Sequence, residues 1–156
     1  MIHIEIEAPY EELVRPDLLE AAARAALEHQ GAPAPSALSI IVSGEDRLQE
    51  LNSRYLGIDA PTDVLSFPSG DLDPESGERY LGDILISAPH ASAQGAAAGH
   101  GAAAEFQLLV VHGVLHLLGH DHAGQAEKDA MWAAQREILE RIGSPARPPD
   151  ESAQDT

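Results

Sequence analysis

Residues 102–118 have the sequence AAAEFQLLVVHGVLHLL, in which large apolar side chains follow one another with few polar interruptions. These side chains are Phe106, Leu108, Leu109, Val110, Val111, Val114, Leu115, Leu117 and Leu118. On a helix they cover nearly every side, and a helix that is apolar all round lies buried in the core. The sequence therefore predicts a central helix. Gly119 is placed to end it, because glycine adopts the positive φ of a C-terminal cap without strain.

The segments before this helix alternate between strand and helix patterns. Residues 2–6 alternate isoleucine with polar residues, which is the period of a half-buried strand. A helical spacing of apolar residues follows, from Pro16 to the stop signal at Gly31. The same reasoning predicts strands at 38–42, 62–67 and 81–87, and a helix at 45–56.

Secondary structure is harder to predict for the segment before the central helix than for the segment after it. Residues 88–104 are rich in Ala, Gly and His, a composition that fits either a linker or a helix; we favour a helix broken near Gly99, because Ala is the strongest helix former. An amphipathic helix is predicted at 125–142. Residues 143–156 carry prolines and acidic side chains with almost nothing apolar, so we predict a disordered tail after a single domain at 1–142.

These elements and the composition together predict the fold class. The chain has 156 residues, 44% of them hydrophobic and 22% charged, which is typical of one globular domain. Strands and helices alternate, but the sheet is small and one strand is expected to be antiparallel. We predict an α+β fold with a small mixed four-stranded sheet packed with about five helices.

Charge and residue usage restrict the partners. The chain has 9 Lys and Arg against 26 Asp and Glu, a net charge of −17, which argues against tight nonspecific binding to nucleic acid. No signal peptide or membrane-spanning run is evident, so we expect a cytoplasmic protein with neither a membrane nor a DNA partner. Cysteine is absent, so any metal site must use His, Asp or Glu.

A cluster of histidines carries the chemistry. Four of the eight histidines fall within the eleven residues 112–122, HGVLHLLGHDH. His112 and His116 lie one helical turn apart on the same face, and Gly119 lets the chain fold back so that His122 reaches the same ion. Three imidazoles bind zinc and leave its fourth position open, as in catalytic sites, where the ion lowers the pKa of bound water. The alternatives are a closed structural site with His120 or Asp121 as fourth ligand, or histidines that bind no metal.

The spacing also resembles the metzincin peptidase pattern, HExxHxxGxxH, except that Gly113 occupies the position of the glutamate. Without that general base, the likeness supports the metal geometry and speaks against peptidase chemistry. Two explanations of Gly113 remain equal at this point: close packing against a neighbouring element, or room for substrate beside the ion.

Three motifs together resemble the YbeY family of zinc-dependent endoribonucleases. They are HGVLHLLGHDH at 112–122, PTDVLSFP at 61–68 and LGDI at 81–84, and the likeness covers essentially everything to residue 142. The resemblance implies a single-domain zinc hydrolase-like α+β fold with one Zn²⁺ per chain, held by His112, His116 and His122. It also implies cleavage of single-stranded RNA in ribosomal RNA maturation, notably at the small-subunit 3′ end, and in ribosome quality control. The implied partners are ribosomal RNA and the ribosome or its proteins.

The chain departs from this family at one position. Members often carry Arg after the aromatic residue of the Leu-Asn-x-x-Tyr segment, where it is thought to contact substrate phosphate, and here Leu56 stands in its place. Arg54 is a candidate substitute, although on a helix the side chains of residues 54 and 56 point in directions about 200° apart. A solvated surface arginine is the simpler interpretation of Arg54.

Further candidate site residues come from the other motifs. Asp63, Ser66 and Asp83 either line the cleft and contact substrate or serve as strand caps and turn formers. Asp121 and His120 are candidates for proton transfer; for Asp121 we favour a role in orienting a ligand imidazole. The nucleophile, water or the substrate 2′-hydroxyl, stays open. The other functional classes are a metallopeptidase-like hydrolase and a ribosome-assembly factor with a structural zinc.

Overall fold

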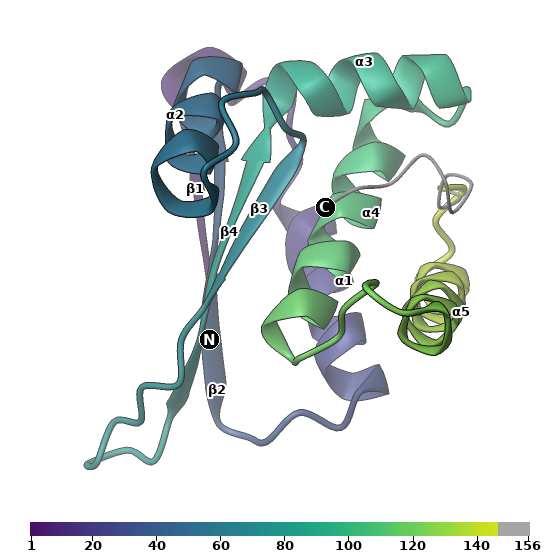
Figure 1. Cartoon of the computed structure of the whole chain (residues 1–156). Coiled ribbons are helices and arrows are strands. Elements are labelled where there is room, and N and C mark those ends of the chain that lie inside the picture. Colours follow the sequence, from purple (N-terminus) through teal and green to yellow (C-terminus); the bar gives the residue numbers. More distant parts are fainter. Residues whose placement is uncertain (147–156) are drawn as a thin grey trace.

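The computed structural model describes residues 1–146 (Figure 1), and residues 147–156, most of the predicted tail, lie outside the described residues. Its elements are β1 (Ile2–Ile6), a short 3-10 turn (Ala8–Tyr10), α1 (Pro16–His29), β2 (Ser36–Ser43), α2 (Glu45–Leu56), β3 (Val64–Pro68), β4 (Arg79–Ser87), α3 (Ala88–Ala98), α4 (Gly101–Leu117) and α5 (Gln125–Arg141). Each predicted strand and helix is present. The break near Gly99, which has a φ of 80°, separates α3 from α4. The α+β fold class is confirmed.

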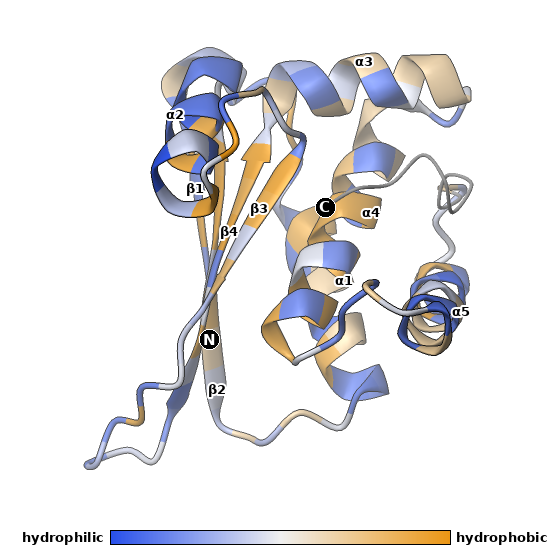
Figure 2. Ribbon diagram, viewed as in Figure 1, coloured by the Kyte–Doolittle hydropathy of each residue, from blue (hydrophilic) through white to orange (hydrophobic). Residues whose placement is uncertain are grey.

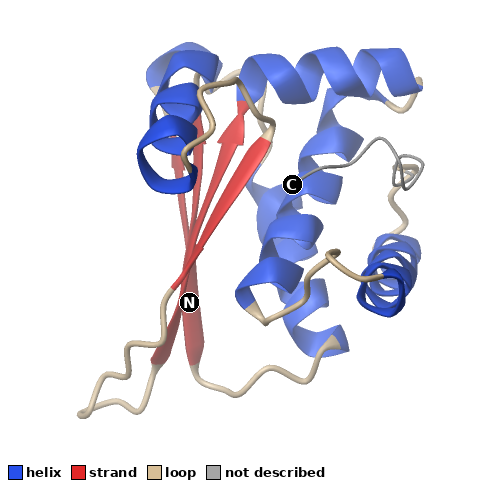
Figure 3. Cartoon of the chain, viewed as in Figure 1, coloured by secondary structure: helices blue, strands red, loops and turns tan. Residues whose placement is uncertain are grey.

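The four strands form one mixed sheet in the order β1-β2-β4-β3 (Figure 3). The pairs β1-β2 and β2-β4 are parallel, whereas β3 runs antiparallel to β4. In the β3-β4 pair, Ser66 lies opposite Ile84 and Phe67 opposite Asp83. Because successive side chains of a strand point to opposite faces, Ser66 and Ile84 share one face and Phe67 and Asp83 share the other.

Helices cover the two faces of the sheet unequally (Figures 1 and 2). On one face α1 and α4 pack against the sheet, and α5 packs on α1 and α4. Buried apolar residues fill the space between these layers. Much of the sheet and of α4 is accordingly coloured as hydrophobic in Figure 2. On the other face α2 covers a smaller cluster centred on Leu48, Leu65 and Leu85. The larger core therefore lies between the sheet and α4, as the sequence predicts.

Gly113 explains how closely α4 approaches the sheet. A Cβ atom at this position would lie 2.7 Å from Cγ2 of Ile84 in β4, closer than side-chain atoms pack in proteins. Gly113 is itself buried. Close packing against a neighbouring element is therefore the explanation that the structure supports, rather than room for a substrate.

The described residues continue past the predicted end of the domain at residue 142. Residues 143–146, the first part of the predicted tail, are described, and Ala146 packs in the core. Ordered contacts thus extend at least four residues beyond the predicted domain boundary at residue 142. Within residues 1–146, none of the helices combines the length and the apolar character needed to span a bilayer.

Candidate metal centre

Local backbone geometry brings the three predicted ligands together. His112 and His116 lie one turn apart in α4, and His122 follows in the loop before α5. Gly119 adopts a φ of 100°, and the backbone N–H groups of Gly119 and His120 donate to the carbonyls of His116 and Leu115 at 3.0 and 2.9 Å. These bonds cap the last turn and reverse the chain, as the sequence predicts for a glycine at this position.

The three imidazoles converge closely enough to hold one ion. One ring nitrogen from each of His112, His116 and His122 lies within 4.8 Å of the other two. The Nε2 atoms of His112 and His116 are 3.0 Å apart. His112 is fully buried, whereas the other two are partly exposed, so the cluster lies at the boundary between core and solvent.

Gln135 of α5 fixes the orientation of His112. Its Oε1 atom lies 2.7 Å from Nδ1 of His112, and both residues are buried. Because an amide oxygen only accepts, Nδ1 carries the proton and Nε2 keeps its lone pair for a metal. This arrangement fits the donor set that zinc requires, three neutral imidazoles with a hydrogen-bonded partner behind the ligand. Sequence analysis missed Gln135. The available signal was a polar residue one turn after Trp132, on the helix face that Trp132 and Leu139 mark as apolar.

Trp132 closes the interior side of the histidine cluster. Its ring centroid lies 5.9 Å from that of His122 and 6.2 Å from that of His112, in edge-to-face arrangements. The indole is 7% exposed and belongs to the core. It therefore contributes an apolar wall that limits the movement of two of the imidazoles.

Asp121 and His120 take other roles than that of a fourth ligand. The Asp121 carboxylate accepts a hydrogen bond from the backbone N–H of His122 at 2.7 Å, so it orders the loop directly rather than through an imidazole. His120 faces α1, where its Nε2 lies 2.6 Å from Oε1 of Gln30, and burial lowers the pKa of His120, with the nearby His29 as a second cause. Among residues 1–146, the ligand group comprises only the three histidines.

A cleft of about 380 Å³ opens beside His112 and His116. Its remaining wall comes from the end of α2, the following loop and β3, and consists of Asn52, Leu56, Ile58, Ala60, Pro61, Thr62, Val64, Leu65, Ser66 and Pro68. Ser66 is thus the one predicted substrate residue that the structure brings beside the histidines in this cleft. Leu56, at the position where the YbeY resemblance leads one to expect Arg, is 58% exposed and also lines the cleft.

Asp63 lies next to the cleft wall but belongs to a different cluster. Its Oδ1 accepts from the N–H of Val64 at 2.8 Å. In the amide orientation that satisfies its neighbours, Gln94 of α3 donates to Oδ2 of Asp63 at 3.3 Å and to Glu105 of α4 at 3.1 Å. His100 lies 2.7 Å from Glu105 in the same cluster. Asp63 therefore ties the start of β3 to α3 and α4.

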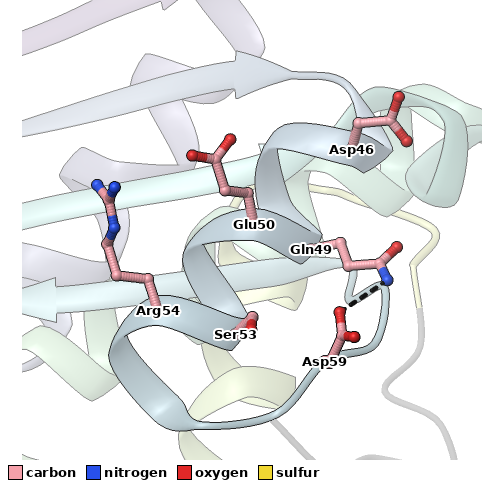
Figure 4. Close-up of a pocket in the computed structure, with 6 residues that line it drawn as sticks. All are labelled: Asp46, Gln49, Glu50, Ser53, Arg54 and Asp59. Atoms are coloured by element: carbon pink, nitrogen blue, oxygen red, sulfur yellow. Dashed lines mark hydrogen bonds between the residues drawn. The ribbon is translucent and has the colours of Figure 1, made fainter.

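Asp83 and Arg54 lie away from the metal centre. Asp83 is on the opposite face of the sheet, where the Tyr80 hydroxyl donates to it, and burial together with this carboxylate raises the pKa of Tyr80. Arg54 is an exposed residue of α2 and helps to line a separate, largely acidic depression, together with Asp46, Gln49, Glu50, Ser53 and Asp59 (Figure 4). Strand alternation turns Asp83 away from the cleft, so the structure does not support the substrate-contact alternative for this residue. The exposed position of Arg54 agrees with the simpler interpretation of a solvated surface arginine.

The family model described as Endoribonuclease YbeY matches residues 4–143. The chain belongs to the YbeY family. Similar proteins named "Endoribonuclease YbeY" include one from Roseiflexus sp. (strain RS-1), 41% identical over 91% of this chain and 92% of its own length. Another, from Salinispora tropica, is 43% identical over 79% of this chain and 85% of its own length.

A solved structure has the same fold. The solution structure of TM1509 from Thermotoga maritima superimposes with a TM-score of 0.58 over 99% of this chain and all of that protein, at 24% sequence identity. At this level of identity the similarity concerns the fold, which agrees with the α+β class predicted from the sequence.

Proposed function

We propose that this chain is a zinc-dependent endoribonuclease that cleaves single-stranded RNA in ribosomal RNA maturation, notably at the small-subunit 3′ end, and in ribosome quality control in the cytoplasm. The observation that carries the proposal is the convergence of His112, His116 and His122 beside a cleft. Membership of the YbeY family and the printed names of its relatives support the class of reaction.

Each residue of the centre has a defined task in this proposal. The three histidines would hold one zinc ion, which supplies Lewis-acid stabilisation of the charge that develops on a phosphodiester group. Gln135 keeps His112 in the tautomer whose Nε2 is free to bind. Ser66, on the cleft wall that faces the histidines, offers a hydroxyl donor to a phosphate oxygen of the substrate. Asp121 holds the backbone of the loop that carries His122.

The charge of the chain determines how the substrate arrives. Binding of free RNA depends on Lys and Arg that neutralise phosphates, and here 9 such residues stand against 26 acidic ones. We therefore propose weak affinity for isolated RNA, with the ribosome or its proteins presenting the strand to the cleft.

Two other functions are less well supported. A peptidase of the metzincin type needs a glutamate at position 113, but the space for a side chain there is occupied by Ile84. A structural zinc needs a fourth protein ligand, and the described ligand group contains three. Ribonuclease activity therefore remains the better proposal.

The test is cleavage of a ribosomal RNA fragment with a single-stranded 3′ extension by zinc-loaded protein. His116→Ala should abolish cleavage while circular dichroism shows an intact fold. The matched control is His90→Ala, because His90 is a surface histidine of α3 paired with Glu45 at 3.1 Å. Cleavage by His116→Ala at the same rate as by the wild type and His90→Ala would indicate a contaminating ribonuclease. No cleavage by the wild type would favour a partner-dependent enzyme or a structural zinc, and cleavage of a casein panel instead of RNA would favour the peptidase.

A further inference from the structure

Four side chains from three separate parts of the fold form a continuous hydrogen-bond chain behind the metal loop. His120 Nε2 lies 2.6 Å from Oε1 of Gln30, at the end of α1. Nε2 of Gln30 lies 2.9 Å from Nδ1 of His29. Nε2 of His29 lies 2.8 Å from a carboxylate oxygen of Glu137, in α5. The chain thus links the loop after α4 to both neighbouring helices.

The chemistry of the four groups fixes the direction of every bond. The carboxylate of Glu137 only accepts, so His29 donates from Nε2 and its Nδ1 accepts. Gln30 then donates its amide N–H to His29 and accepts from His120 through its carbonyl oxygen. All three bonds point toward the carboxylate, an arrangement in which each bond polarises and strengthens the next.

The position of His120 in the sequence lets the hydrogen-bond chain affect where the loop lies. His120 lies between Gly119, where the backbone turns, and His122, the third candidate ligand. The short-range bonds of this loop include those from Gly119 to His116, from His120 to Leu115 and from His122 to Asp121. The bond to Gln30 spans 90 residues of sequence and attaches the loop to a helix that packs on the core. It therefore sets where the loop lies relative to α4.

We propose that the hydrogen-bond chain formed by Glu137, His29, Gln30 and His120 positions the loop so that His122 converges with His112 and His116. None of its members contacts the metal position, so it acts through the loop backbone. The inference rests on the metal-binding part of the proposed function. Its consequence is that removing the middle link weakens metal binding without weakening the apo fold to the same extent.

The experiment compares zinc affinity and apo-protein stability in four variants of the full chain. Gln30→Ala removes two of the three bonds, those to His120 and His29, and Glu137→Ala removes the terminal acceptor. Glu137→Gln keeps an amide oxygen that accepts from His29. The matched control is Gln49→Ala, because Gln49 also makes a side-chain hydrogen bond, to Asp59 at 3.1 Å, but on α2. Zinc dissociation constants come from competition with a chromogenic chelator, and apo stability from thermal unfolding with EDTA.

We expect Gln30→Ala to raise the zinc Kd by up to about tenfold. This is the lower end of the range for losing a direct hydrogen-bond partner of a metal ligand, because Gln30 acts through the loop rather than on a ligand. Glu137→Ala should raise the Kd less, and Glu137→Gln and Gln49→Ala should stay close to wild type. In the apo form of Gln30→Ala, amide hydrogen exchange should become faster for residues 118–122 and stay unchanged in the rest of the protein. An unchanged Kd in Gln30→Ala, or a rise matched by general loss of apo stability, would overturn the proposal. Failure of the wild type to bind zinc would instead overturn the metal centre itself.

Discussion

Oε1 of Gln135 in α5 accepts a hydrogen bond from Nδ1 of His112 in α4, across 2.7 Å and entirely within the core. The bond joins two helices that are adjacent in the chain but meet only after the loop at 118–124 has reversed its direction. It fixes the ring of His112 and the position of its proton at once. The state of the most buried candidate ligand is therefore determined by a residue that does not face the metal position.

Gln135→Leu should reduce zinc affinity by about 10- to 100-fold, because His112 loses the acceptor that holds its Nδ1 proton. The apo fold should lose about 1–3 kcal/mol, because the Nδ1 proton of His112 is left without an acceptor in the core. It should nevertheless survive, since leucine has a similar volume and the Nε2 atom of Gln135 has no hydrogen-bond partner among the described residues. Gln135→Glu keeps an acceptor at this place and should bind zinc at least as tightly as wild type. Equal affinities of Gln135→Leu and wild type, measured by chelator competition, would remove Gln135 from the centre.

Gly113→Ala should destabilise the protein by about 1–3 kcal/mol, the cost of overpacking a core. Helix propensity alone predicts the opposite sign, a gain of about 1 kcal/mol. The contact with Cγ2 of Ile84 decides between them, because this branch of a buried side chain cannot move aside. Urea unfolding measures the difference.

A double-mutant cycle tests the cause of this loss. In an Ile84→Ala background the clash is absent, so Gly113→Ala should cost less there, with a coupling of about 0.5–3 kcal/mol. Additive losses, or a stabilised Gly113→Ala single variant, would contradict the packing explanation.

The parts of the site that could be predicted from the sequence are those that depend on local geometry. The spacing of His112 and His116 and the turn at Gly119 act over a few residues, so they predict the convergence of the ligands. Gln135 and Gln30 were missed because their contacts depend on how α5 and α1 dock, over 23 and 90 residues of sequence.

Asp83 shows a different source of error, because the alternating pattern that decides its direction was already present in the sequence. Ile84 and Ile86 of β4 belong to the core beneath α4. Strand alternation then turns Asp83 to the other face of the sheet, away from the histidines. The motif that contains Asp83 made it a candidate site residue, whereas strand alternation, had it been applied to 81–87, places it on the other face.

Glu105 makes stability depend on pH. Burial raises the pKa of its carboxyl above the ordinary value, against the opposing effect of His100, and the charge of Asp63 adds to the rise. Folding thus favours the protonated form, so the contribution of Glu105 is complete below its ordinary pKa and is lost as the pH rises through the higher folded-state value. Glu105→Gln does not ionise, and its stability relative to wild type should be greater at about pH 7 than at about pH 4. Urea unfolding at both pH values checks this, and a difference that is constant or reversed would refute it.

Leu56→Arg should strengthen binding of single-stranded RNA. Leu56 is exposed and lines the cleft beside His112 and His116. A guanidinium at this position would neutralise a phosphate of a strand lying in the cleft, which should raise affinity roughly three- to tenfold at low salt. The slope of log affinity against log salt should steepen by about 0.7, the value for one added phosphate contact on a single strand.

The matched control is Leu72→Arg, which adds the same charge at an equally exposed leucine in the β3-β4 connection, a segment that extends away from the helices (Figure 1). Titration of a labelled single-stranded RNA at several salt concentrations compares the two variants with wild type. A gain confined to Leu56→Arg places the strand in the cleft beside the histidines. An equal gain in both would mean that net charge, rather than position, sets the affinity, and no gain in either would contradict the cleft as the path of the RNA.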